Sequence, residues 1–309
     1  YEISCSLVGS EMCIRDSTEK PRIGIYTMGL KAYWEQFPGL RERLLHYGRF
    51  IAEKITEMNA EVFFYGLADC EEAGESCGEF FNAKNVDLIF AHAGTYVNSS
   101  SVLPIHQICK APVIILNLQP TARIAYDRTT TGEWLAHCGA CPVPELSNAF
   151  HRSGISCHII NGLLGLEHTP DISLTNENTA ARPEAVRAWK EISEWVKAAS
   201  VKRELSGCRF GFLGNTYNGM LDMYSDFTMV QAQTGAHIEI LEMCDLDRML
   251  RQVTEEEVEE KKTEIREFFL ISDDKAADPL AQRPTEEQLD WSARVAAAQE
   301  RLVREYRLD

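Results

Sequence analysis

The sequence contains no apolar run long enough to cross a membrane and no secretory signal at its start. A transmembrane helix requires about 20 consecutive apolar residues, and no segment approaches that length. A signal peptide requires a basic start and an apolar stretch of about 7–15 residues. Here the first charge is Glu2, and the polar residues 4–6 interrupt the apolar ones around them. These absences argue against a membrane or secreted protein and predict a cytoplasmic location.

Basic residues are scarce relative to acidic ones. The chain has 31 Lys and Arg against 47 Asp and Glu, which gives a net charge of −16. An acidic surface repels the phosphates of nucleic acids and anionic lipid headgroups, so neither nucleic acid nor membrane is expected as a partner. The ten cysteines are scattered through apolar segments of a long chain. We therefore expect reduced, buried thiols rather than disulfides.

Two phosphate-binding motifs are also missing. The sequence has no G-x-G-x-x-G dinucleotide-binding turn and no G-x-x-x-x-G-K-[ST] loop. These absences argue against a dinucleotide-binding enzyme and an NTPase. In the first loop, Lys31 stands beside two aromatic residues, Tyr33 and Trp34. This combination suits a polyhydroxylated ligand better than a pyrophosphate.

Compact apolar runs alternate with amphipathic segments in the first half of the chain. The predicted strands are residues 22–28, 62–65, 86–90, 113–117 and 157–160. Residues 39–58 carry apolar side chains at helical spacing. Continuously apolar strands separated by helices are typical of a parallel sheet covered on both faces, and therefore of an α/β fold. Ligands of such folds bind beyond the carboxyl ends of the strands.

The polar stretch 167–182 predicts a boundary between an N-terminal α/β domain, residues 18–166, and a central α/β domain, residues 167–309. A helix over 183–199 would cross between them. The second domain is expected to contain strands 209–213 and 238–243, and helices 227–233, 254–269 and 284–308. Thr254 and Glu257 predict a capping box for the second of these helices. We expect both domains to be Rossmann-like or flavodoxin-like three-layer units with mainly parallel sheets.

Two loops carry residue types that bind polar ligands. Residues 129–132, three threonines and a glycine, can present hydroxyls and backbone N–H groups. The alternative is an N-cap cluster on a buried helix. Residues 214–226 contain Tyr217, which suits sugar hydroxyls, and Met220, which can form an apolar wall. The alternative there is a strand-to-helix loop that faces solvent.

A Cys-x-x-Cys pair follows the first of these loops. His137, Cys138 and Cys141 allow a metal or redox interpretation. A structural zinc site requires a second pair of ligands. Cys157 and His158 could supply that pair, but they also fit a strand that alternates its two faces. Reduced structural thiols are the simpler alternative.

Two longer stretches carry a family resemblance: "LNLQPTARIAYDRTTTGEWLAHCGACPVPELSNAFHRSGI" and "WKEISEWVKAASVKRELSGCRFGFLGNTYNGMLDMYSDFTMV". From about residue 21 to its end, the chain resembles the L-arabinose isomerase family of the L-fucose/L-arabinose isomerase superfamily. The resemblance implies an enzyme that interconverts aldoses and ketoses with a divalent metal, usually Mn²⁺. In such enzymes a proton moves between C1 and C2 of the sugar through an ene-diol.

The resemblance also implies where the chemistry lies. The family's metal ligands, two Glu and two His, belong to a C-terminal domain beyond the helix matched by residues 284–308. The catalytic residues are therefore expected beyond Asp309, with no catalytic or metal-binding residue within this chain. The fragment alone is expected to be inactive.

The same resemblance implies a sugar-binding role for two loops. In the family a homo-oligomer shares active sites between subunits, and that role falls on residues 29–34 and 128–133. The expected sugar-contacting residues are Lys31, Tyr33, Arg128, Thr131, Gly132, Tyr217 and Met220.

The loops depart from the arabinose-specific pattern. Lys31 stands where the family has a Gln, and Arg128 and Thr131 stand roughly where it has a Gln and a His. The sugar is therefore left open. The alternative function is a non-catalytic sugar-binding module of the periplasmic-binding or sensor type.

Residues 1–17 resemble a translated sequencing-adapter leader, with residues 7–16 as the matching core. We expect native sequence to begin near Thr18 and the leader to pack against nothing.

Overall fold

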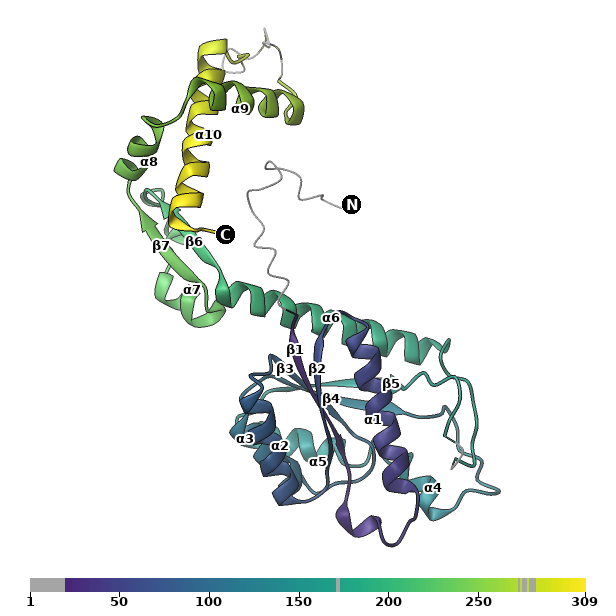
Figure 1. Cartoon of the computed structure of the whole chain (residues 1–309). Coiled ribbons are helices and arrows are strands. Elements are labelled where there is room, and N and C mark those ends of the chain that lie inside the picture. Colours follow the sequence, from purple (N-terminus) through teal and green to yellow (C-terminus); the bar gives the residue numbers. More distant parts are fainter. Residues whose placement is uncertain (1–19, 171–172, 272, 274–276, 278–281) are drawn as a thin grey trace. The chain divides into compact units, whose positions relative to one another are not determined.

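The computed structural model describes residues 20–170, 173–271, 273, 277 and 282–309 (Figure 1). The chain divides into two compact units, one that ends at Arg203 and one that begins at Glu204. Each unit is described by itself below. The expectation that residues 1–17 pack against nothing lies outside the described residues.

The first unit contains a five-stranded parallel sheet. Its strands are β1 (Arg22–Met28), β2 (Glu61–Ala68), β3 (Leu88–His92), β4 (Val113–Gln119) and β5 (Cys157–Leu163). They lie in the order β2-β1-β3-β4-β5, and every neighbouring pair is parallel. This is the flavodoxin-like strand order. The predicted α/β fold is confirmed.

Helices cover both faces of this sheet, which gives three layers (Figure 1). One face carries α1 (Leu40–Thr56) and α6 (Pro183–Gly207). The other carries α2 (Glu71–Ala83), α3 (Ser99–Ile108) and α5 (Val143–Arg152). A short helix, α4 (Thr131–Leu135), follows the loop after β4.

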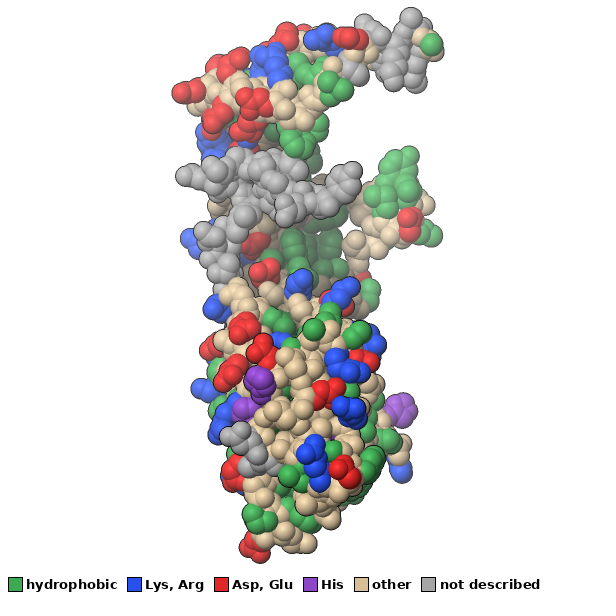
Figure 2. Space-filling model, turned by 90° about the vertical axis from the view of Figure 1, so that its right-hand side faces the viewer, with side chains coloured by type: hydrophobic (Ala, Val, Ile, Leu, Met, Phe, Trp, Pro, Cys, Tyr) green, Lys and Arg blue, Asp and Glu red, His purple; other side chains and the backbone are tan. Residues whose placement is uncertain are grey.

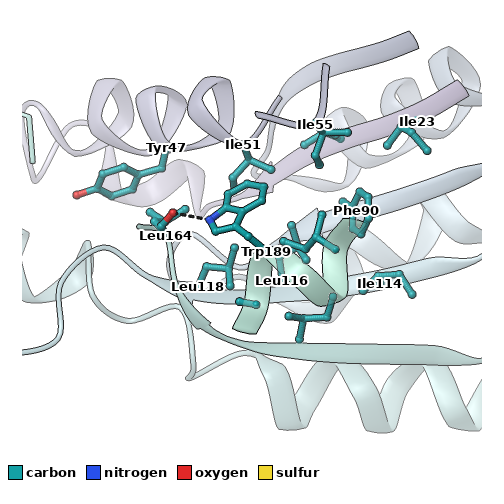
Figure 3. Close-up of a cluster of buried hydrophobic side chains, with 14 of the residues drawn as sticks. Ile23, Tyr47, Ile51, Ile55, Phe90, Ile114, Leu116, Leu118, Leu164 and Trp189 are labelled. Atoms are coloured by element: carbon teal, nitrogen blue, oxygen red, sulfur yellow. Dashed lines mark hydrogen bonds between the residues drawn. The ribbon is translucent and has the colours of Figure 1, made fainter. Parts of the chain in front are cut away.

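The core forms because strand side chains alternate between the two faces. In β3, Leu88 and Phe90 pack toward α1 and α6, while Ile89 and Ala91 pack toward α2, α3 and α5. Figure 3 shows the apolar cluster between the sheet and helices α1 and α6, with Trp189 of α6 at its centre. The Trp189 indole Nε1 donates a hydrogen bond to the Leu164 carbonyl at 2.8 Å, so the one polar atom of this large apolar side chain is satisfied.

The division between the units falls inside α6 rather than at residue 166, where the sequence placed it. The polar stretch after residue 166 belongs to the first unit, where the Thr179 N–H donates to the Leu166 carbonyl at 2.8 Å. The apolar stripe of α6, including Ile192 and Val196, completes the core over the first sheet. A boundary therefore follows this stripe instead of preceding it.

The second unit is built around a pair of parallel strands, β6 (Arg209–Leu213) and β7 (His237–Leu241). Its helices are α7 (Phe227–Thr234), α8 (Met243–Leu250), α9 (Glu255–Phe268) and α10 (Glu286–Tyr306). A larger second sheet is not seen among the residues of this unit that the structure describes. Apolar side chains of α8, α9 and α10 form its core, among them Met249, Val258 and Ala298.

Candidate functional site

The first unit contains an open cavity of about 460 Å³ beside the carboxyl ends of β1 and β4. Two segments line most of it: residues 36–40 with Arg43, which follow β1, and residues 130–133, which follow β4. Leu174 completes the lining. Its place at the ends of parallel strands is where α/β folds bind ligands, and its volume lies within the range of small-molecule pockets.

A buried ion pair joins the two walls of the cavity. Arg43 Nη1 of α1 donates to Glu133 Oε2 of α4 at 2.7 Å, and the two side chains are only 3% and 2% exposed. Ser173 Oγ donates to the other carboxylate oxygen at 3.0 Å. Burial opposes the ionisation of Glu133, but the hydrogen bond and charge of Arg43 outweigh it and lower the pKa of this carboxyl. The pair therefore fixes the spacing of segments that are 90 residues apart.

Three buried polar atoms, two of them in Arg43 itself, have no hydrogen-bond partner among the described residues. They are Nε and Nη2 of Arg43 and the hydroxyl of Tyr47, one helical turn further along α1. Burial, opposed in part by the charge of Arg43, raises the pKa of Tyr47 to about 12, so its hydroxyl keeps its proton. Such groups are commonly satisfied by a buried water molecule.

The three threonines at the start of α4, residues 129–131, have different roles. The Thr130 hydroxyl accepts a hydrogen bond from the Glu133 N–H at 3.2 Å and so caps α4. The Thr129 hydroxyl donates to the Ala125 carbonyl at 2.6 Å. The N-cap interpretation thus holds for Thr130, while Thr131 and Gly132 lie on the cavity wall.

The structure brings together only part of the predicted sugar-contacting set. Thr131 and Gly132 line the cavity. Lys31 and Tyr33 lie in the short helix η1 (Lys31–Tyr33) after β1 and are not among the lining residues; Lys31 is exposed, and Tyr33 packs edge-on against Phe37, which does line the cavity. Arg128 is exposed in a turn outside the lining.

The remaining two predicted residues belong to the second unit. Tyr217 and Met220 lie in the loop after β6 and are 68% and 44% exposed. This agrees with a loop that faces solvent, the alternative raised for residues 214–226.

Asp309, the residue beyond which the catalytic groups are expected, is bonded to the first residue of β6. Its carboxylate accepts a hydrogen bond from the Arg209 N–H at 2.9 Å, and its own N–H donates to the Arg209 carbonyl at 3.0 Å. These two bonds hold the segment after α10 beside β6. Asp309 therefore has a structural role in the second unit. The position of the catalytic residues beyond it stays a prediction.

Arg43 and Phe37 are functional candidates that the sequence did not single out. For Arg43, its position in the sequence pattern of α1 is a signal of burial. It stands three residues after Leu40 and four before Tyr47, on the apolar stripe of α1, and all three are buried. A charged residue on an apolar stripe is rarely buried unless it is paired. Its partner Glu133 is too distant in sequence to be predicted from local patterns.

The Cys-x-x-Cys segment does not form a metal site. His137 is held by the Thr121 hydroxyl and the Glu133 carbonyl, each at 2.9 Å. Cys157 and His158, the pair considered as further ligands, lie in β5, where His158 pairs with Glu191 at 2.6 Å. Among the described residues, no group of three or more His, Cys, Asp or Glu is placed to hold a metal ion. These residues therefore fit neither a zinc site nor a Mn²⁺ site.

One G-x-S-x-G pattern is present, at residues 74–78. A hydrolase nucleophile elbow places its Ser at a sharp turn between a strand and a helix. Ser76 instead lies inside α2. A Cβ on Gly74 would lie 2.1 Å from the Ser101 carbonyl oxygen, and one on Gly78 would lie 3.0 Å from that of Ile105. The two glycines thus allow α2 and α3 to pack closely, and they do not shape an active site.

Comparisons with known proteins identify neither a family nor a function. No protein-family model matches the chain, and no curated protein matches it. Among solved structures, a candidate acylhydrolase from Bacteroides fragilis NCTC 9343 is 11% identical, over 62% of this chain and 92% of that one, with a TM-score of 0.30. CobK precorrin-6A reductase is 10% identical, over 72% and 87% of the two chains, with a TM-score of 0.21. Likenesses this distant do not bear on activity.

Proposed function

We propose that the chain is the N-terminal and central part of a metal-dependent aldose–ketose isomerase and that its first unit binds sugar. The observation that supports this proposal is the place of the cavity. One wall is residues 130–133, which lie within the segment 128–133 to which the family resemblance assigns sugar contacts. The other wall, residues 36–40, directly follows the second assigned segment, residues 29–34, which does not itself line the cavity. The sugar itself is left open, because Lys31, Arg128 and Thr131 depart from the arabinose pattern.

The cavity walls supply the groups that a sugar requires. The Thr131 hydroxyl and the backbone at Gly132 offer hydrogen bonds to sugar hydroxyls, and Phe37 offers an apolar wall for the C–H face of the ring. The Arg43–Glu133 pair is a positioning element in this scheme, because it holds both walls at a fixed distance.

The proposal places the metal ligands and the proton-transfer groups beyond Asp309, outside this chain. Mn²⁺ would hold two sugar oxygens there and favour the ene-diol chemistry. The residues described here bind and orient the sugar, in a homo-oligomer whose neighbouring subunit completes the site. A cytoplasmic location is part of the proposal; none of the described helices has the length and apolar character to span a membrane.

Sugar binding is tested on the 309-residue chain by saturation-transfer NMR with a panel of aldopentoses, aldohexoses and their ketoses. Thr131→Val removes the hydroxyl and keeps the shape. We expect it to weaken binding about 2- to 10-fold, the effect of one hydrogen bond. Thr56→Val is the control, since the Thr56 hydroxyl donates to the Ala52 carbonyl of its own helix. Equal binding by both variants would argue against this cavity as the sugar-binding site.

Isomerisation is tested on the product of the complete reading frame, with Mn²⁺ and then with a chelator. The proposal expects aldose-to-ketose conversion that is lost on chelation and restored by Mn²⁺. Conversion that resists chelation would reject the metal-dependent mechanism. Sugar binding with no conversion would favour the non-catalytic sugar-binding module.

A further inference from the structure

Cys138 and Cys141 lie in the turn between α4 and α5, with their sulfur atoms 2.8 Å apart. Both are free thiols. A disulfide bond measures about 2.05 Å, so these atoms need to move less than about 1 Å to bond. The Cys141 N–H donates to the Cys138 carbonyl at 3.1 Å and closes the four-residue turn. The backbone already has the geometry that brings the two sulfur atoms together.

The turn is held in place from both sides. The Cys138 N–H donates to the Leu135 carbonyl at 3.1 Å, which ties the turn to the end of α4. Gly139, between the two cysteines, lies against the backbone just after β3, and a Cβ on it would lie 2.1 Å from the Ala93 carbonyl oxygen. A larger residue cannot occupy this position without a shift of the backbone. The two thiols are therefore paired by the fold and not by chance contact of flexible side chains.

The two thiols differ in their access to solvent. Cys141 is exposed, whereas Cys138 is only 5% exposed. Burial, together with the hydrogen bond and charge of Cys141, raises the pKa of Cys138 to about 12. Because the thiolate is the reactive form, Cys138 is a poor first nucleophile. An external reagent meets Cys141 first.

We propose that Cys138 and Cys141 form a thiol–disulfide exchange site that accepts small disulfides from solution. The Cys141 thiolate attacks one sulfur of a disulfide R–S–S–R, which forms a Cys141–S–S–R bond and releases one thiolate RS⁻. The Cys138 thiol then gives up its proton and attacks Cys141 Sγ, which releases the second RS⁻. Each RS⁻ takes one of the two protons. The chain loses two electrons and two protons, and the small disulfide is reduced to two thiols.

Three other described cysteines each lack one feature of this site, either access to solvent or a partner thiol. Burial, and to a smaller extent the charge of the nearby Cys109, raises the pKa of Cys77. Both thiols are buried and offer no entry to an external reagent. Cys244 is exposed, and no described cysteine is paired with it. It should therefore react with a small disulfide and stop at the mixed disulfide. The site is independent of the proposed sugar binding, since it requires neither a sugar nor a metal.

The test uses the full 309-residue chain, fully reduced and then incubated with oxidised glutathione. The products are read by intact mass and by peptide mapping after the remaining thiols are blocked. We expect the wild-type peptide that contains residues 138–141 to lose two hydrogens. In Cys138→Ser the same peptide should instead keep one glutathionyl group on Cys141. In Cys141→Ser, oxidation of Cys138 should slow by at least about tenfold, because the remaining thiol is buried.

Cys244→Ser serves as the matched control and should leave the reaction at residues 138–141 unchanged. Excess reduced glutathione should reopen the disulfide. A wild-type protein that accumulates the glutathionyl adduct on Cys141, as Cys138→Ser does, would overturn the proposal. A Cys141→Ser variant in which Cys138 reacts at the wild-type rate would also overturn it. The product that the wild-type protein forms, a disulfide or a glutathionyl adduct, tests the proposal even if a variant fails to fold.

Discussion

The two units use different means to hold their secondary structure. In the first unit, strands β1, β3 and β4 are buried on both faces, and apolar residues from five helices cover them. In the second unit, β6 and β7 are mostly half-buried or exposed, and Ile240 is 61% exposed. Green apolar side chains are visible at the surface of this unit in the upper part of Figure 2. The first unit therefore depends on apolar burial far more than the second does.

The helices show the same contrast in their caps. In the second unit α8, α9 and α10 each begin with a capping box. In the first unit α1, α2, α3 and α5 begin without a side-chain cap. Local sequence signals therefore specify α8, α9 and α10 of the second unit, whereas packing against the sheet specifies α1, α2, α3 and α5 of the first.

The largest effect is expected from a matched pair of isoleucines. Ile115 of β4 is fully buried, so Ile115→Ala should lower the free energy of unfolding of the first unit by about 2–5 kcal/mol. Ile240 of β7 is exposed, so Ile240→Ala should cost the second unit less than about 1 kcal/mol. Urea unfolding followed by circular dichroism measures both. Similar losses in the two units would show that β7 is covered in solution.

A second test uses pH and acts on the first unit. His92 and His106 are buried beside Thr27 and Tyr26, at 3.2 Å and 3.1 Å. Burial lowers the pKa of each to about 3. The unfolded chain takes up these protons below about pH 6.5 and the folded unit does not. Stability is therefore complete above pH 6.5 and falls as the pH drops toward 3, by about 1.4 kcal/mol per pH unit for each histidine.

This pH effect is measured between pH 6.5 and 5, where few carboxylates titrate. Trp291 is the one tryptophan beyond Glu204, so in Trp291→Phe the tryptophan fluorescence reports on the first unit alone. Burial also lowers the pKa of His137, so His106→Gln should reduce the slope without abolishing it. His151→Gln, at an exposed position, should leave it unchanged. If the stability of the first unit did not change between pH 6.5 and 5, the pKa values of His92 and His106 would not be lowered in the folded protein.

The smallest effect is expected at a helix cap. The Thr254 hydroxyl accepts the Glu257 N–H at 3.3 Å at the start of α9, so Thr254→Ala should destabilise the second unit by about 1 kcal/mol. Asn98 stands at the same position of α3, but its side chain makes no cap hydrogen bond. Asn98→Ala should therefore change stability by only a few tenths of a kcal/mol. Thermal unfolding of both variants measures the difference, and an equal loss at the two caps would contradict it.

The strands of the first unit could be predicted from sequence because each is a compact apolar run. Residues 22–28 were predicted with the bounds that the structure gives β1, and residues 209–213 with those of β6. The capping box at Thr254 correctly located the start of α9. Residues 242–243 were wrongly placed in a strand, because the apolar Met243 hides a helix start that Glu242 and Asp245 cap.

The candidate site was less predictable. Thr131 and Gly132 were expected from residue type, and they do line a cavity. The opposite wall depends on Arg43, whose role is visible only when a partner 90 residues away is in place. Helix α3 was also missed, because it begins with three serines and contains Pro104. Contacts of this kind depend on tertiary packing, which local periodicity does not encode.

The strand order of the first unit sets a constraint on protein synthesis. β1 leaves the ribosome before its two neighbours in the sheet, β2 and β3, and Ile192 of the covering helix α6 comes much later. At about 5–20 residues per second, translation takes roughly 10–30 s to pass from β1 to that helix. During this interval β1, which is buried along almost its whole length in the folded unit, has no complete sheet to join, so chaperones that bind extended apolar segments have a long opportunity there.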